Sequence, residues 1–123
     1  MITHENRVFA IEQYEKTIVV SPQGDATGFR YTDIHKDTNG LVDLIDRKGI
    51  ENLVIDFAQV NILGSIIISS IIKLARKIST KDGKACFCQA SESMREVVSS
   101  MNLTRLWPYF ETLDEAIAHL NNE

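Results

Sequence analysis

Residues 53–80, LVIDFAQVNILGSIIISSIIKLARKIST, decide the fold of this 123-residue chain. The stretch begins with an apolar run that only Asp56 interrupts, which is typical of a strand inside a sheet with both faces buried. Residues 58–64 then predict a loop. The isoleucine-rich segment that starts at Ser65 predicts a helix, because its apolar residues recur at helical spacing. A strand that leads through a loop into a helix is the repeating unit of an α/β fold.

Ser65 stands at the junction between this loop and this helix, and its side chain allows two interpretations. A serine hydroxyl at a helix start can accept a hydrogen bond from a free backbone N–H and so act as an N-cap. The same place favours added negative charge, because free N–H groups and the positive end of the helix dipole converge there. Ser65 is therefore either an N-cap or a phosphorylation switch.

The rest of the chain alternates between strand and helix patterns. Residues 1–6 are polar and are expected to lack regular structure, and Glu15-Lys16 suits the turn of an opening hairpin. Runs of β-branched and other apolar residues predict strands at residues 8–13, 17–22, 52–57 and 84–89 and a short last strand within 106–110. Helical spacing predicts helices at residues 29–47, from Ser65 to the Asp82-Gly83 stop, from Ser91 or Ser93, and from Thr112.

Two of these helix starts have the spacing of a capping box, in which a Ser or Thr side chain and a Glu three residues later bond each other's backbone N–H groups. The pairs are Ser93 with Glu96 and Thr112 with Glu115. We therefore expect reciprocal caps at the third and the last helix.

This order of elements predicts a single α/β domain over residues 1–123. Strands that alternate with helices imply parallel neighbours, and the opening β-hairpin makes the sheet mixed. We expect four or five strands, mostly parallel, with about four helices packed chiefly on one face of the sheet.

Composition and charge exclude several classes of protein. A hydrophobic content of 44% and a charged content of 24% are those of an ordinary globular domain. The net charge of −4 argues against non-specific binding to nucleic acid. No apolar run approaches the roughly 20 residues that span a bilayer, and the N-terminal residues lack the pattern of a signal peptide. A cytoplasmic location is the expectation.

No pattern in the chain predicts a catalytic, cofactor or metal site. Cys86 and Cys88 lie on one face of a strand without a second pair at metal-ligand spacing, so we expect both to be buried and structural. The three histidines, His4, His35 and His119, fall in separate elements. Gly-rich phosphate loops and nucleophile elbows are absent from the sequence. The chain is predicted not to be an enzyme.

Asp56 at the end of a central strand has the position of the phosphoacceptor in response-regulator receiver domains. Such domains also need an acidic pair after the first strand and a lysine after a late strand. The first predicted strand instead ends at Gln13-Tyr14-Glu15. We therefore expect Asp56 to bond neighbouring N–H groups at the strand end.

Three segments resemble one known family. Residues 60–68, VNILGSIII, are similar to its motif V-D-F-(I/M)-D-S-(S/T)-G-L. Residues 94–107 are similar to V-R-x-V-L-x-x-x-G-L-x-x-L-F, and residues 112–116 to S-x-E-E-A at the start of a closing helix. The family is STAS, the bacterial anti-sigma-factor antagonists and their relatives, and the resemblance covers nearly the whole chain. It implies a STAS-like fold.

The resemblance also implies a function. In the family, the first Ser of the motif is phosphorylated by a partner kinase that is often also the anti-sigma factor. The unphosphorylated protein binds this partner, and a PP2C-type phosphatase resets the cycle. By position the phosphoacceptor is Ser65. The residues expected to bind the partner surround it: Asn61, Leu63, Gly64, Ile66 and Ile67.

The motif departs from the family around its serine. Gly64 replaces the Asp before the acceptor, Ile66 replaces the second Ser or Thr, Ile67 replaces the Gly, and Asn61 replaces an earlier Asp. Two hypotheses follow: a regulator switched by phosphorylation, or a constitutive STAS scaffold or accessory subunit of a transport or signalling complex. Homodimerisation through an exposed isoleucine stays open in both.

Overall fold

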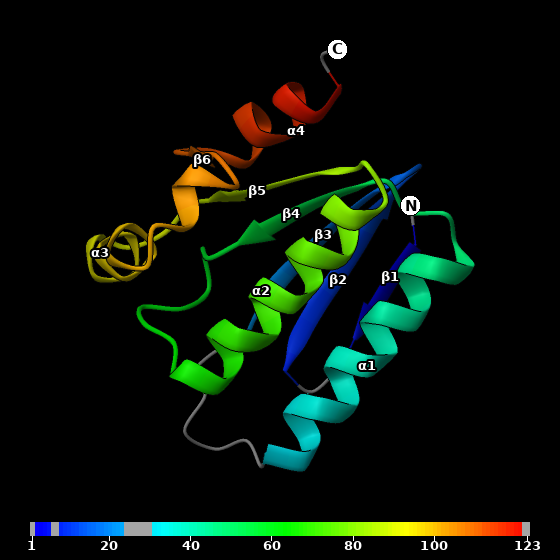
Figure 1. The fold of residues 1–123 in the computed structure, drawn as a ribbon, viewed down its shortest axis with the longest axis horizontal. Helices are drawn as coiled ribbons and strands as arrows, with labels where there is room; N and C mark the ends of the chain where they lie inside the picture. The colour runs from blue at the N-terminus through cyan, green and yellow to red at the C-terminus, as the bar shows by residue number, and fades with distance from the viewer. Residues whose placement is uncertain (1, 6–7, 24–30, 122–123) are drawn as a thin grey trace.

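The computed structural model describes residues 2–5, 8–23 and 31–121, which form one mixed sheet with helices against it (Figure 1). β1 to β3 pair antiparallel and β3 to β6 pair parallel, so the predicted α/β fold class and the opening hairpin are confirmed. The strands lie in the sheet in chain order: β1 (Ile2–Glu5), β2 (Phe9–Tyr14), β3 (Thr17–Pro22), β4 (Asn52–Asp56), β5 (Lys84–Cys88) and β6 (Tyr109–Phe110).

The first strand was not predicted. β1 pairs antiparallel with β2, from Ile2 opposite Gln13 to Glu5 opposite Ala10, where the sequence suggested no regular structure. An edge strand is held by backbone hydrogen bonds to one neighbour only, and a polar segment such as ITHE gives no apolar alternation that reveals them. The sheet therefore has six strands where four or five were expected.

Four α-helices of the described residues lie in the predicted segments: α1 (Tyr31–Arg47), α2 (Ser65–Thr80), α3 (Glu92–Ser100) and α4 (Leu113–Asn121). The first two residues of the predicted range 29–47 lie outside the described residues, and α1 continues through Asn39 and Gly40. A short 3-10 helix, η2 (Leu103–Arg105), links α3 to β6.

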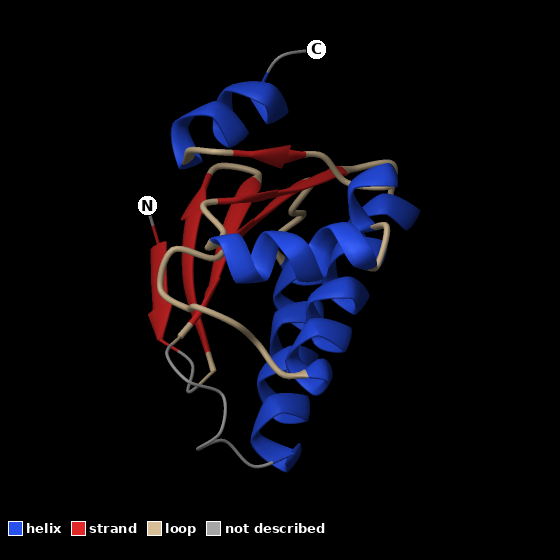
Figure 2. Cartoon of the chain, turned by 90° about the vertical axis from the view of Figure 1, so that its left-hand side faces the viewer, coloured by secondary structure: helices blue, strands red, loops and turns tan. Residues whose placement is uncertain are grey.

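The sheet has a large core on one face and a small one on the other. Along β4, Leu53 and Ile55 join the large core under α1, α2 and α3, while Val54 joins the small core under α4. Figure 2 shows α1, α2 and α3 gathered on one side of the strands. Cys86 and Cys88 are buried in the small core and unbridged, as expected.

The two predicted capping boxes have different outcomes. At α4, Thr112 Oγ1 accepts from the Glu115 N–H, and Glu115 Oε1 accepts from the Thr112 N–H, both at 3.1 Å. At α3 the N-cap is Ser91, whose hydroxyl accepts from the Met94 N–H at 3.1 Å. The box predicted at Ser93 is therefore wrong, because Ser93 already lies inside the helix.

Candidate functional site

The loop from residue 57 to residue 64 leaves the carboxyl end of β4 and leads to the first turn of α2, and Asp56 anchors its start. Asp56 is 8% exposed, and its Oδ1 accepts from the Ala58 N–H at 3.0 Å and from Gln89 Nε2 at 2.9 Å. The first bond shapes the turn after the strand, and the second ties β4 to the end of β5. The prediction that Asp56 bonds neighbouring N–H groups is confirmed.

Ser91 anchors the middle of the same loop. Its hydroxyl donates a hydrogen bond to the Asn61 carbonyl while accepting one from the Met94 N–H. One side chain thus caps α3 and holds the loop against the start of that helix. No sequence pattern predicts the bond to Asn61, because the two residues are 30 positions apart.

Two residues expected to bind the partner lie in the core. Leu63 is 6% exposed and Ile67 is 2% exposed, and both belong to the large core cluster. They fix the end of the loop and the first turn of α2 on the sheet. Neither side chain is therefore open to solvent, and both support the neighbouring exposed residues from below.

Ser65 is not an N-cap. Gly64 occupies that place with an extended backbone, φ −73° and ψ 164°, and no side chain caps α2. Ser65 is the first residue of the helix and is exposed, and no hydrogen bond of its hydroxyl occurs in the described part of the chain. The cap interpretation is wrong because glycine itself suits the N-cap backbone, and the hydroxyl stays accessible.

Exposed apolar side chains lie on both sides of Ser65 in the chain. Ile62 is 53% exposed and Ile66 is 42% exposed, which is unusual for isoleucine. Ile62 was missed as a site residue because nothing in a short loop sequence tells an inward side chain from an outward one. We call the exposed residues here the Ser65 surface: Asn61, Ile62, Gly64, Ser65 and Ile66.

Ile66 also lines a groove of about 210 Å³ between α1 and α2. These two helices lie side by side over one face of the sheet (Figure 1). The groove continues the Ser65 surface along α2. Its lining residues are His35 and Thr38 from α1 and Ile66, Ser69, Ser70 and Lys73 from α2.

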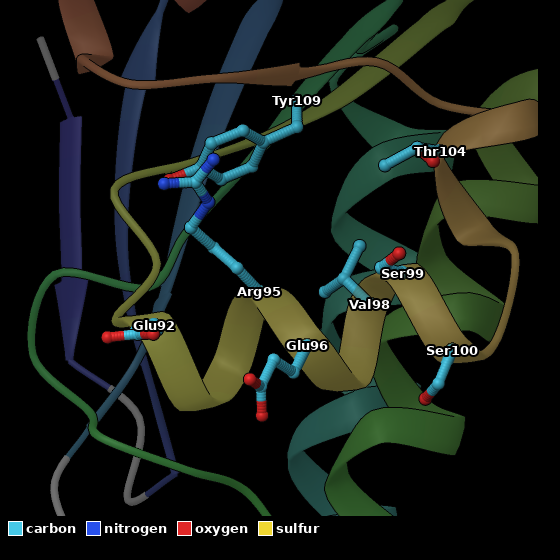
Figure 3. Close-up of a pocket in the computed structure, with 8 residues that line it drawn as sticks. All are labelled: Glu92, Arg95, Glu96, Val98, Ser99, Ser100, Thr104 and Tyr109. Atoms are coloured by element: carbon cyan, nitrogen blue, oxygen red, sulfur yellow. The ribbon is translucent and has the colours of Figure 1, made fainter.

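A larger hollow of about 740 Å³ lies beside α3 (Figure 3). The guanidinium of Arg95 lies over the ring of Tyr109, 5.2 Å from its centroid, and ion-pairs with Glu111 at 3.7 Å. Figure 3 shows Glu92, Glu96 and Thr104 pointing in different directions. Because no polar groups converge on one point, this hollow lacks the arrangement of a catalytic site.

The two thiols are held neutral. Burial raises the pKa of Cys86 to about 12, and burial together with the carboxylate of Asp56 raises the pKa of Cys88. Neither thiol is therefore a nucleophile at neutral pH. In the part of the chain that the structure describes, no group of three or more His, Cys, Asp or Glu residues could hold a metal ion. None of the helices described is long and apolar enough to cross a membrane.

Comparisons with solved structures find the same fold in several proteins. A crystal structure of a candidate anti-sigma factor antagonist from Thermotoga maritima has a TM-score of 0.80 and 18% identity, covering 94% of this chain and 97% of that one. Unphosphorylated SpoIIAA, an anti-sigma factor antagonist, has a TM-score of 0.77 and 16% identity, covering 94% and 97%. An anti-sigma factor antagonist from Mycobacterium paratuberculosis has a TM-score of 0.73 and 20% identity, covering 93% of each chain.

Sequence comparison gives the family directly. No curated protein sequence matches this chain. The model of the STAS domain matches residues 8–116, which include every element from β2 to β6 and the first residues of α4. The chain belongs to the STAS domain family.

Proposed function

We propose that this chain is a non-enzymatic regulator of the anti-sigma-factor-antagonist type that binds its partner through the Ser65 surface. The partner is an anti-sigma factor or serine kinase of the partner-switching class. Phosphorylation of Ser65 by that kinase ends the binding, and a PP2C-type phosphatase restores it. SpoIIAA, a structural neighbour, is known in both unphosphorylated and phosphorylated forms, which supports a switch of this kind.

The observation that carries the proposal is an exposed serine hydroxyl, without a hydrogen bond to any described residue, that lies between two exposed isoleucines in the chain. Ile62 and Ile66 offer apolar area to a partner, while Leu63 and Ile67 hold that area on the core. A binding surface on a rigid base loses little conformational entropy when the partner docks. Ser65 lies within that surface, so a change in its charge acts on the contact directly.

Phosphate on Ser65 would have opposite effects on the helix and on the interface. It adds about −1.5 to −2 charge at the positive end of the dipole of α2, whose first turn carries no acidic residue, so the fold tolerates it. The same charge must lose its water when Ile62 and Ile66 are covered by a partner. Binding is therefore weakened while the domain stays folded.

Two measurements test the switch. Intact mass of the protein from its native cells is expected to show a phosphorylated fraction that Ser65→Ala lacks. Ser65→Asp is expected to weaken partner binding at least tenfold, and the matched control is Ser93→Asp, which adds the same charge at an exposed position in the first turn of α3, outside the Ser65 surface. A phosphate-free protein under all growth conditions and with the cognate kinase would refute the switch.

A constitutive scaffold or accessory subunit is the second candidate, favoured by the loss of polar residues around the acceptor. Gly64, Ile66 and Ile67 leave no acidic group beside Ser65 to steer a kinase or phosphatase. One structural neighbour belongs to the stressosome, described as a signal integration and transduction hub. In this case the purified partner binds wild type, Ser65→Ala and Ser65→Asp with equal affinity.

A further inference from the structure

We propose that the groove between α1 and α2 binds an acidic side chain, Asp or Glu, of the partner segment that docks on the Ser65 surface. This inference rests on the proposed function and names the chemistry of the partner. The groove is lined by both helices and shares Ile66 with the Ser65 surface. A segment that covers Ile66 therefore reaches the groove without a separate docking event.

Ser70 provides a buried donor inside the groove. It is only 7% exposed, and its hydroxyl makes no hydrogen bond with any of the described residues. The neighbouring Thr38, 2% exposed, differs because its Oγ1 donates to the Ile34 carbonyl at 2.7 Å. The Ser70 Oγ is not among the enclosed side-chain atoms that lack a partner, so the hydroxyl is open to the groove and can donate to an acceptor that enters from outside.

Lys73 provides a positive charge that none of the described acidic residues neutralises. Its Nζ donates to the neutral amide oxygen of Asn39 at 3.4 Å, and none of the ion pairs between described residues includes it. One turn further along α2, Lys77 is paired with Asp46 at 3.1 Å. The sequence of α2 contains no Asp or Glu, so the open cation at the groove favours a carboxylate from a partner.

The size of the groove favours one side chain over a free ligand. Its volume of about 210 Å³ lies below the roughly 300–1,000 Å³ of small-molecule sites. Ile66 and Ser70 are one turn apart, a rise of about 6 Å along the helix, close to the ~7 Å between alternate residues of an extended chain. The partner segment is therefore expected to place an apolar residue two positions from an Asp or Glu.

Selection from a random dodecapeptide library on phage, with the full chain as bait, tests this expectation. Enriched peptides should share an aliphatic or aromatic residue two positions from Asp or Glu. Fluorescence anisotropy with a labelled, selected peptide should show roughly tenfold weaker binding to Lys73→Glu and weaker binding to Ser70→Ala. Arg76→Glu is the matched control, since it makes the same change of charge on the exposed face of α2 outside the groove.

Four outcomes would overturn the groove proposal. The first three are a selection that enriches no peptide over a bait-free control, a consensus without acidic residues, and equal losses for Arg76→Glu and Lys73→Glu. Peptides that need Ile66 but not Lys73 would remove the groove and leave the Ser65 surface as the docking site. Peptides that need Lys73 but bind Ser65→Asp unchanged would support the groove and contradict the phosphorylation switch.

Discussion

Gly64→Asp restores the acidic residue that precedes the acceptor in the family motif, and the structure indicates that it stabilises the fold. Gly64 is the N-cap of α2, and its φ of −73° and ψ of 164° are open to any L-residue. A Cβ built there meets nothing within 4 Å. An Asp side chain at an N-cap can accept from the free N–H groups of the first turn.

Three contributions set the size of the gain. Asp is better than Gly at an N-cap by a few tenths of a kcal/mol. A negative charge at the helix start contributes about 0.3–1 kcal/mol at low ionic strength. Replacing a glycine whose backbone suits other residues adds about 0.4–1 kcal/mol by restricting the unfolded chain. We expect the free energy of unfolding to rise by about 1–2 kcal/mol, which raises the Tm by several degrees for a domain of this size.

Urea unfolding followed by the fluorescence of Trp107, the one tryptophan of the chain, measures this change. Two matched variants separate its causes. Gly64→Ala restricts the unfolded chain without a cap, and Gly64→Asn caps without a charge. The expected order of stability is Asp, then Asn, then Ala, with the gap between Asp and Asn shrinking in 1 M salt. If the Asp and Ala variants are equally stable, Gly64 is not an N-cap with free N–H groups beside it.

Three further predictions concern residues outside the Ser65 surface. Ser79→Ala leaves Trp107 Nε1 without its 2.9 Å acceptor and should lower the free energy of unfolding by about 1–3 kcal/mol. In a Trp107→Phe background the same change should cost nothing further, so urea unfolding of both pairs is followed by circular dichroism. Asp56→Ala leaves Gln89 Nε2 and the Ala58 N–H without their acceptor and should lower the free energy of unfolding by about 2–4 kcal/mol. Scanning calorimetry should show this loss as a lower Tm. Burial raises the pKa of Cys86 from 9.0 to about 12, so the thiol of the unfolded chain loses its proton at a lower pH than that of the folded chain. As pH rises between these values, Cys86 should therefore lower the free energy of unfolding by about 1.4 kcal/mol per pH unit. The fall should be less steep in Cys86→Ala.

The elements that sequence predicted best are those whose whole pattern reflects burial. β3 has the predicted bounds, residues 17–22, because its side chains are buried or half-buried along its whole length. α2 begins at Ser65, where a loop without apolar periodicity changes to isoleucines at helical spacing. β1 was missed because backbone pairing alone holds an edge strand, and composition does not report backbone pairing.

The site was harder to predict than the fold because a shift of one position along a helix decides whether a side chain is buried or exposed. Ile66 and Ile67 are identical in sequence, yet one is 42% exposed and the other 2%, since successive helix positions are turned by about 100°. The sequence predicted an exposed isoleucine, because three in succession span too wide an arc of a helix for all of them to face inward. It did not identify the outward one, because that depends on how α2 is rotated over the sheet.

The departures from the family motif change what the site can use for binding. With Gly64 in place of an acidic residue and Ile66 in place of a hydroxyl, little polar side chain remains around Ser65 to hydrogen-bond a partner. Burial of Ile62 and Ile66 then supplies more of the binding free energy, at about 25 cal/mol for each Å² of apolar area covered. Such a contact is strengthened by apolar area but is more sensitive to a buried charge, because few neighbouring polar side chains could compensate a phosphate there. Under the proposed function, the loss of the motif's polar residues therefore makes a phosphorylated Ser65 a stronger barrier to partner binding.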